Sequence, residues 1–378
     1  MLSKQKKLKV KLNKLVLFSN FSHQLKLLKL KVLLKSKYLP SCFRMSNSCN
    51  NEYLRAHGVV FPPNKPLEPR IEFSKTPVVY DALFFLDFNE NGNCIIGASE
   101  VAGTFWEGTL LHFKDEKDME NFDYMGHYIY ATTSDGKFVK NNIIALAEDT
   151  GNISVLSLDS DSTIRPINYF KTIERIPQLS IWTNSSKILS CSGRSVAIWD
   201  ADSVDRRPSE KFDNYHTESV TCIDTLRKDT NLFLSGGRDR LCCIWDIRNP
   251  IACSVLYANE FSSITSISWN QDDDNFIAVG TLAGDVYLVD KREPKDFLSV
   301  LPCFHGAVNR MSFNNSKQFA VCGDVPEVLI VNTDKNALKV IYKNSEHSGP
   351  VKDVKWYNGT LYSCGFGKCV VKHSRQSE

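Results

Sequence analysis

The sequence predicts an all-β fold, a seven-bladed WD-repeat β-propeller, and three observations lead to this prediction. Residues 216–246 carry the complete signature of one propeller blade. The ends of the expected third strands recur at intervals of 41, 46, 44, 43 and 40 residues, which is a period typical of propeller blades. An extended, proline-rich segment precedes the first blade and offers a strand that would close the ring.

The blade at 216–246 also predicts its own hydrogen-bond network. Its polar residues fall at the four positions of a structural tetrad: His216, Ser235, Asp239 and Trp245. We expect the indole to donate to the serine, the serine to the histidine and the histidine to the aspartate, which would tie three strands together. A histidine near an aspartate and a serine could also form a hydrolase triad, but the Trp-Asp ending and the repeats favour the structural role.

The same repeats give the domain organisation. We expect a basic, disordered N-terminal extension at 1–52 and one propeller at 53–374. The blades are expected at 80–113, 127–159, 169–200, 215–246, 259–290, 305–333 and 347–373. The last blade offers only three strands, so a strand from within residues 54–79 would be its fourth. The acidic segment 114–125 is expected to be a loop between the first two blades.

Charge is distributed unevenly along the chain. The net charge is +3, but residues 1–44 hold eleven Lys and one Arg without an acid, and the remaining 34 basic against 43 acidic residues give −9. An acidic body attracts basic partners and disfavours nucleic-acid phosphate. The basic segment itself has three interpretations: a mitochondrial presequence, a membrane or nucleic-acid arm, or a dispensable extension before Met45, which we favour.

Composition and motifs argue against catalysis and metal binding. The twelve Cys form no CxxC pair and no spacing typical of metal ligands, so structural thiols in a reducing compartment are expected. The sequence contains no glycine-rich phosphate loop, nucleophile elbow or kinase motif. We therefore expect a protein without enzymatic activity, cofactor, small-molecule ligand or direct nucleic-acid contact, located in the cytoplasm, with the nucleus as an additional compartment.

Several stretches resemble the methylosome protein 50 family. In the first blade these are Pro-Pro-Asn-Lys-Pro at 62–66, Gly-Ala-Ser at 97–99 and Trp-Glu-Gly-Thr-Leu at 106–110. In the last blade they are residues 347–353 and a closing His373 in place of Trp-Asp. The resemblance covers about residues 60–374. The divergent second blade, the acidic loop before it and the basic extension suggest an outlying member, such as the family's germ-plasm counterpart.

The resemblance implies a function. Propellers of this family are obligate cofactors of the arginine methyltransferase that makes symmetric dimethylarginine. They dock on the enzyme's N-terminal TIM barrel within a hetero-oligomer, and help present basic substrates such as Sm proteins and histone tails. By resemblance, Trp106 is the aromatic anchor, with Phe105 and Thr104 beside it in the partner-binding loop. The alternative for Trp106 is that its indole packs within its own blade.

Other functions are weighed against this one. A general WD-repeat scaffold or a ubiquitin-ligase substrate receptor is the main alternative, although no ligase-docking motif stands out. An RNA-binding protein that uses its basic arm would show salt-dependent binding lost on deletion of residues 1–44. A hydrolase would require Ser235 to be reactive.

Overall fold

The structure is a computed structural model in which a defined part of the chain is described. The described residues are 78–101, 106–182, 185–213, 215–249, 253–334 and 337–373, together with the backbone of 59–60. The predicted basic extension at 1–52 lies outside them. All of the described residues belong to one compact unit.

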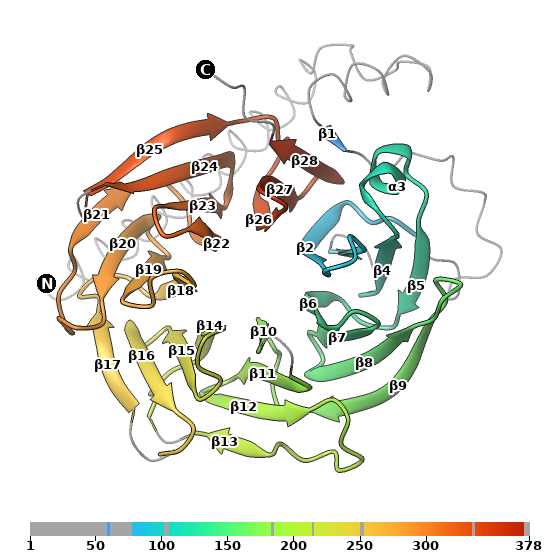
Figure 1. Ribbon diagram of the computed structural model, residues 1–378, viewed down its shortest axis with the longest axis horizontal. Helices are drawn as coiled ribbons and strands as arrows, with labels where there is room; N and C mark the ends of the chain where they lie inside the picture. The colour runs from blue at the N-terminus through green and yellow to red at the C-terminus, as the bar shows by residue number, and fades with distance from the viewer. Residues whose placement is uncertain are drawn as a thin grey trace, which may run out of the picture. The chain divides into compact units, whose positions relative to one another are not determined.

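The described residues form a seven-bladed β-propeller, as predicted. Seven four-stranded antiparallel sheets surround a central axis (Figure 1). In six of the sheets the four strands are consecutive in the chain and adjacent in the sheet. Each sheet therefore forms as a local meander, and the chain adds sheets one after another around the ring.

We number the sheets in chain order. Sheet 1 contains β2 (Ala82–Phe88), β3 (Cys94–Ser99), β4 (Gly108–Phe113) and β5 (Met125–Ile129). Sheet 2 contains β6 (Thr133–Lys140), β7 (Ile143–Glu148), β8 (Asn152–Leu158) and β9 (Ile164–Lys171). Sheet 3 contains β10 (Leu179–Ile181), β11 (Lys187–Ser192), β12 (Ser195–Asp200) and β13 (Glu210–Phe212). Sheet 4 contains β14 (Val220–Thr225), β15 (Leu232–Gly237), β16 (Leu241–Asp246) and β17 (Cys253–Ala258).

The remaining sheets complete the ring. Sheet 5 contains β18 (Ile264–Trp269), β19 (Phe276–Thr281), β20 (Asp285–Asp290) and β21 (Ser299–Pro302). Sheet 6 contains β22 (Val308–Asn315), β23 (Gln318–Gly323), β24 (Val325–Asp334) and β25 (Ala337–Asn344). Sheet 7 contains β26 (Val351–Tyr357), β27 (Thr360–Gly365), β28 (Cys369–His373) and β1 (Val59–Val60).

The ring is closed by a strand from the N-terminal side of the propeller. Val59 pairs with Val371 and Val60 with Val370, so β1 is the fourth strand of sheet 7. This confirms that a segment within 54–79 completes the last blade. Pairing at this edge supplies hydrogen-bond partners to β28, which would otherwise expose its backbone groups.

The sheets extend further along the chain than the predicted blades do. Residues 125–129 form the outer strand of sheet 1, although the prediction began the second blade at 127. The outer strand of sheet 2 likewise includes residues 169–171, which the prediction assigned to the third blade. Outer strands face solvent on one edge and show weak hydrophobic alternation, so their pattern resembles that of a connecting loop.

The acidic segment expected as a loop contains a short helix. The helix α3 (Glu116–Asn121) begins after Asp115, whose Oδ1 accepts the N–H of Asp118 at 2.9 Å. It ends at Phe122, which takes the left-handed conformation (φ 63°). Helix and cap bury Met119 and Phe122 among residues of sheets 1 and 7. Capping residues at both ends explain why a segment this polar forms a helical turn.

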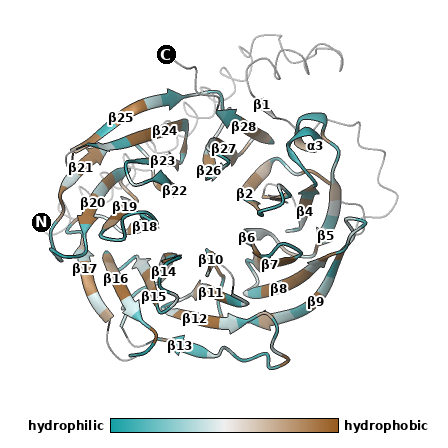
Figure 2. Cartoon of the chain, viewed as in Figure 1, coloured by the Kyte–Doolittle hydropathy of each residue, from teal (hydrophilic) through white to brown (hydrophobic). Residues whose placement is uncertain are grey.

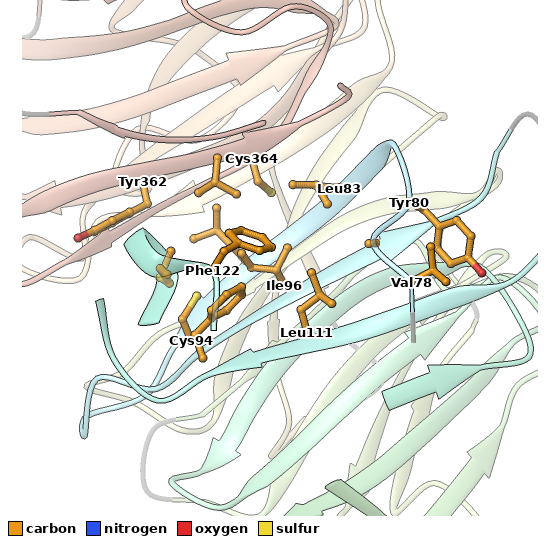
Figure 3. Close-up of a cluster of buried hydrophobic side chains, with 14 residues drawn as sticks. Val78, Tyr80, Leu83, Cys94, Ile96, Leu111, Phe122, Tyr362 and Cys364 are labelled. Carbon is orange, nitrogen blue, oxygen red and sulfur yellow. The ribbon is translucent and has the colours of Figure 1, made fainter. Parts of the chain in front are cut away.

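Apolar side chains fill the spaces between neighbouring sheets. Hydrophobic residues concentrate along the strands, whereas the turns are hydrophilic (Figure 2). Seven buried clusters are found among the described residues, each made by two adjacent sheets. At the closing seam, Tyr362 and Cys364 of sheet 7 face Leu83 and Ile96 of sheet 1 (Figure 3). Burial of this surface is the main force that holds the sheets together.

Polar contacts reinforce every seam near the central axis. In each case a side chain on the innermost strand of one sheet, or just before that strand, is hydrogen-bonded to the backbone of the innermost strand of the next sheet. Five of the seven bonds are accepted by carboxylate or amide oxygens, and the remaining two are donated by a threonine hydroxyl and an asparagine amide. In ring order, the side chains are those of Asp87, Asp135, Gln178, Asp224, Thr265, Asn309 and Asp353.

One buried cation joins sheets that are far apart in sequence. Arg310 of sheet 6 lies 3.2 Å from Asp353 of sheet 7 and 3.2 Å from Asp135 of sheet 2, all three side chains being largely buried. Burial alone would lower the pKa of Arg310, but the two carboxylates outweigh it and raise that pKa. They also hold the guanidinium in place across the ring interior. A buried carboxylate left without this cation would be strongly unfavourable.

We predict that Arg310→Met lowers the free energy of unfolding by about 3–5 kcal/mol, because Asp135 and Asp353 stay buried without their shared cation. The measurement is urea denaturation followed by circular dichroism. Arg165→Met is the matched control, since the paired side chains of Arg165 and Asp159 are both exposed, and it should change stability by less than about 1 kcal/mol. Equal denaturation midpoints for Arg310→Met and wild type would contradict the role assigned to Arg310.

Candidate functional site

The four tetrad residues are brought together in sheet 4. His216 Nδ1 lies 2.8 Å from Asp239 Oδ2, and His216 Nε2 lies 2.7 Å from Ser235 Oγ. The indole N–H of Trp245 donates to the same Oγ at 2.7 Å. Because the serine oxygen accepts from the indole, its own proton points to Nε2, and Nδ1–H donates to the aspartate. The chain of donors runs in the order expected from the sequence.

This geometry stabilises the sheet and does not support hydrolysis. Ser235 has an exposed fraction of 0%, and His216 of 5%. Burial works to raise the pKa of Asp239, but its hydrogen bond with His216 outweighs this and lowers that pKa. The serine oxygen is fully buried and is engaged by His216 and Trp245, so the hydrolase interpretation has no support from the geometry.

Sheet 7 contains a variant of this network in which a histidine replaces the tryptophan. Ser363 Oγ lies 2.7 Å from His347 Nε2 and 2.8 Å from His373 Nε2. His373 Nδ1 lies 3.1 Å from the hydroxyl of Tyr342, which belongs to sheet 6. His347 Nδ1 has no hydrogen-bond partner, because the turn after β27 carries no aspartate. The closing His373 therefore links the last two sheets.

The histidines of the closing region are held neutral by burial. Burial lowers the pKa of His347 to about 4, and burial together with His347 lowers the pKa of His373 to about 3. In sheet 1, burial and the charge of Lys114 lower the pKa of His112 to about 4. Each imidazole is therefore uncharged near pH 7 and would disrupt its surroundings on protonation.

The candidate partner-binding residue lies on sheet 1. Trp106 lies two residues before the start of β4 and has an exposed fraction of 64%. Four of the other five tryptophans are buried, and Trp356 is partly buried. The indole of Trp106 is thus presented to solvent and does not pack within its own blade. Exposed tryptophans are among the residues that most often dominate a protein interface.

Two tyrosines lie at the same end of sheet 1 as Trp106. Gly108 pairs with Ile129, so the chain after β5 lies at the same end of the sheet as Trp106. Tyr130 has an exposed fraction of 75%, and its ring makes an edge contact with Tyr128 at a centroid distance of 4.9 Å. We refer to Trp106, Tyr128 and Tyr130 as the tryptophan surface.

A buried carboxylate is hydrogen-bonded to the tryptophan surface. Glu107, the residue after Trp106, accepts hydrogen bonds from the hydroxyls of Tyr128, at 2.6 Å, and of Tyr80. Burial and the bond to Glu107 raise the pKa of Tyr128. Tyr80 is itself part of the apolar cluster at the closing seam. The tryptophan surface is therefore joined to the closing seam by two hydrogen bonds.

The predicted neighbours Thr104 and Phe105 lie outside the described residues, so their contacts with a partner stay a prediction. Tyr128 and Tyr130 were not predicted as site residues, because their strand was assigned to the second blade. The pairing of β4 with β5 places them at the same end of sheet 1 as Trp106.

The described residues offer few other sites. No group of three or more His, Cys, Asp or Glu side chains suited to a metal ion is found among them. Within the same residues, no helix is long and apolar enough to cross a membrane. The described cysteines are unpaired, and most of them are buried.

Comparisons with known proteins agree with the fold and with the resemblance. Residues 209–246 match the WD domain, G-beta repeat family. The methylosome protein WDR77 of Xenopus laevis is 23% identical, over 77% of this chain and 89% of that protein. Protein valois of Drosophila melanogaster is 22% identical, over 82% of this chain and 89% of that protein. These relatives confirm the resemblance to the methylosome protein 50 family.

A solved structure also resembles the propeller. A chain in the crystal structure of a mitotic checkpoint complex superposes with a TM-score of 0.63, covering 82% of this chain and 94% of that chain. The two sequences are 16% identical, so this likeness concerns the fold alone.

Because the buried histidines have lowered pKa values, we expect the free energy of unfolding to depend on pH. Their folded pKa values lie below the unfolded value of about 6.5, so below that pH the unfolded chain binds protons first and the free energy of unfolding falls as pH falls. We expect His373→Gln to reduce the loss of stability between pH 7.5 and 5.0 by about 2 kcal/mol. Urea midpoints at both pH values measure this difference, and an unchanged pH dependence in the variant would show that His373 is not held neutral.

Proposed function

We propose that this chain is a non-catalytic WD-repeat adaptor that binds the symmetric (type II) protein arginine methyltransferase and presents basic substrates to it. Sm proteins and histone tails are the substrates we propose, in a hetero-oligomer that acts in the cytoplasm and also in the nucleus. Germ-plasm assembly is one process in which such an adaptor would act.

The exposure of Trp106 is the observation that carries this proposal. The family resemblance assigns the anchor role to this residue, and its indole is 64% exposed at the end of sheet 1. The similarity of the whole propeller to a methylosome protein and to valois supports the same partner. Insertion of the indole into a pocket on the enzyme's TIM barrel would bury a large apolar surface.

The hydrogen bonds of Glu107 favour a defined conformation of the tyrosines beside Trp106. Glu107 accepts a hydrogen bond from Tyr128, and the ring of Tyr128 contacts that of Tyr130. A surface held in one conformation before binding loses less conformational entropy when the partner docks. Outside the basic extension the chain carries a net charge of −9, which would steer arginine-rich substrates toward the assembly more than it would add affinity.

We predict that Trp106→Ala leaves the propeller folded but weakens binding to the methyltransferase by about 30-fold or more, the loss expected for an interface hot spot. The measurement is the dissociation constant of the purified proteins by surface plasmon resonance, with circular dichroism as the folding check. Phe261→Ala is the matched control, because Phe261 is 89% exposed on the connection between sheets 4 and 5.

The outcomes test the anchor role of Trp106 and the identity of the partner separately. Loss of binding in Trp106→Ala with normal binding in Phe261→Ala supports the proposal. Equal affinity of Trp106→Ala and wild type would disprove the anchor role. Failure of the wild-type chain to bind the methyltransferase, with recovery of ubiquitin-ligase subunits from cells in its place, would favour a ligase substrate receptor.

A further inference from the structure

A polar cavity lies where the innermost strands end. Its volume is about 520 Å³, within the range of pockets that hold small ligands or single side chains. All seven sheets contribute to its lining through β2, β6, β10, β14, β18, β22 and β26. Figure 1 shows these strands arranged around the central axis. A cavity lined by all seven of them lies on that axis.

Equivalent positions on the seven innermost strands form a ring in this cavity. In six sheets the ring position is two residues after the first residue paired beyond the first β-bulge of the innermost strand. In sheet 3, whose pairing has no bulge, Ser180 takes the same place opposite Leu189. We call these residues the cavity ring: Asp87, Lys137, Ser180, Asp224, Ser268, Ser312 and Lys355. All seven line the cavity, and all seven are polar or charged.

Most of the charge in and beneath the cavity ring is compensated. Lys355 lies 2.7 Å from Asp87, and Lys137 lies 3.1 Å from Asp135. Arg310 joins Asp135 to Asp353 as described above. Three carboxylates thus face three cations, so these six charges compensate one another.

Asp224 is the exception. Its Oδ2 accepts the backbone N–H of Trp269 at 2.7 Å, and its Oδ1 accepts the N–H of Thr225 at 2.9 Å. No cation of the described residues forms an ion pair with it, and Arg227, at the exposed lip, acts on it only at longer range. Burial raises the pKa of Asp224, and Arg227 and Lys355 do not outweigh this effect.

The neighbours of Asp224 along the ring are hydrogen-bond acceptors without competing charge. Ser268 and Ser312 follow it on sheets 5 and 6, and both line the cavity. Ser180, on the other side, is bonded to the hydroxyl of Thr225 at 3.0 Å. One arc of the ring therefore offers a carboxylate flanked by hydroxyls, which is the arrangement that suits a cation with several N–H donors.

We propose that this cavity binds a guanidinium or ammonium group, with Asp224 as its counter-ion and Ser268 and Ser312 as additional acceptors. The group could belong to a free amine or to an arginine or lysine side chain of a peptide. This site is distinct from the tryptophan surface, and the inference does not rest on the proposed methyltransferase partner. It departs from the sequence-based expectation that the protein has no small-molecule ligand.

The test is a calorimetric titration of the full chain with two guanidinium probes. Agmatine represents a free amine, and N-acetyl-Gly-Arg-Gly-amide represents a peptide side chain. Binding of agmatine alone identifies a free amine as the source, binding of the peptide alone identifies a side chain, and both outcomes support the site. The same peptide with citrulline in place of arginine should not bind, because it carries no charge. Absence of heat with either guanidinium probe up to about 10 mM overturns the proposal.

Variants locate the binding at Asp224. Asp224→Asn keeps an oxygen that can accept the N–H of Trp269, so the seam between sheets 4 and 5 should persist, while probe affinity should fall by about tenfold or more. Asp272→Asn makes the same charge change at an exposed loop and should leave affinity unchanged. Ser312→Leu fills the cavity without altering Asp224 and should also weaken binding. Wild-type affinity in Asp224→Asn would overturn the proposal.

Discussion

The structure depends on the seam that joins the last sheet to the first. Every other seam forms between sheets that are consecutive in the chain, whereas this one must bring the two ends of the propeller together. It combines strand pairing at β1, the apolar cluster around Tyr362, the hydrogen bond from the Leu86 N–H to Asp353, and the contact of Tyr362 with Glu116 of the helix α3. A long loop closure has an entropic cost that these contacts together must offset.

The closing seam is also connected to the tryptophan surface. Sheet 1 forms one side of the seam and carries Trp106 at its end. Tyr80 packs in the seam and donates to Glu107, and Glu107 also holds Tyr128. The tryptophan surface is therefore attached to the most constrained part of the ring, and a change that opens the seam would also release the aromatic surface. This coupling supports the docking role proposed for sheet 1.

Features that depend on short sequence patterns could be predicted, whereas features that depend on contacts between sheets could not. The tetrad around Trp245 and the repeat of about forty residues are local patterns, so the fold and the closing strand could be predicted. Tyr128 was missed because its outer strand lacks a strong alternating pattern, and Tyr130, which follows that strand, was missed with it. The network of Arg310 and the uncompensated Asp224 could not be predicted, because each depends on side chains from different sheets that meet only when the ring closes.

The central claim is that a closed, rigid ring presents Trp106 to a methyltransferase. Hydrogen–deuterium exchange of the propeller, alone and with the enzyme, tests this claim most directly. The account predicts slower exchange at residues 106–113 and 125–131 in the complex, while the seams of sheets 3–6 stay unchanged. Protection confined to other sheets, with residues 106–113 exchanging as fast as in the free protein, would contradict it.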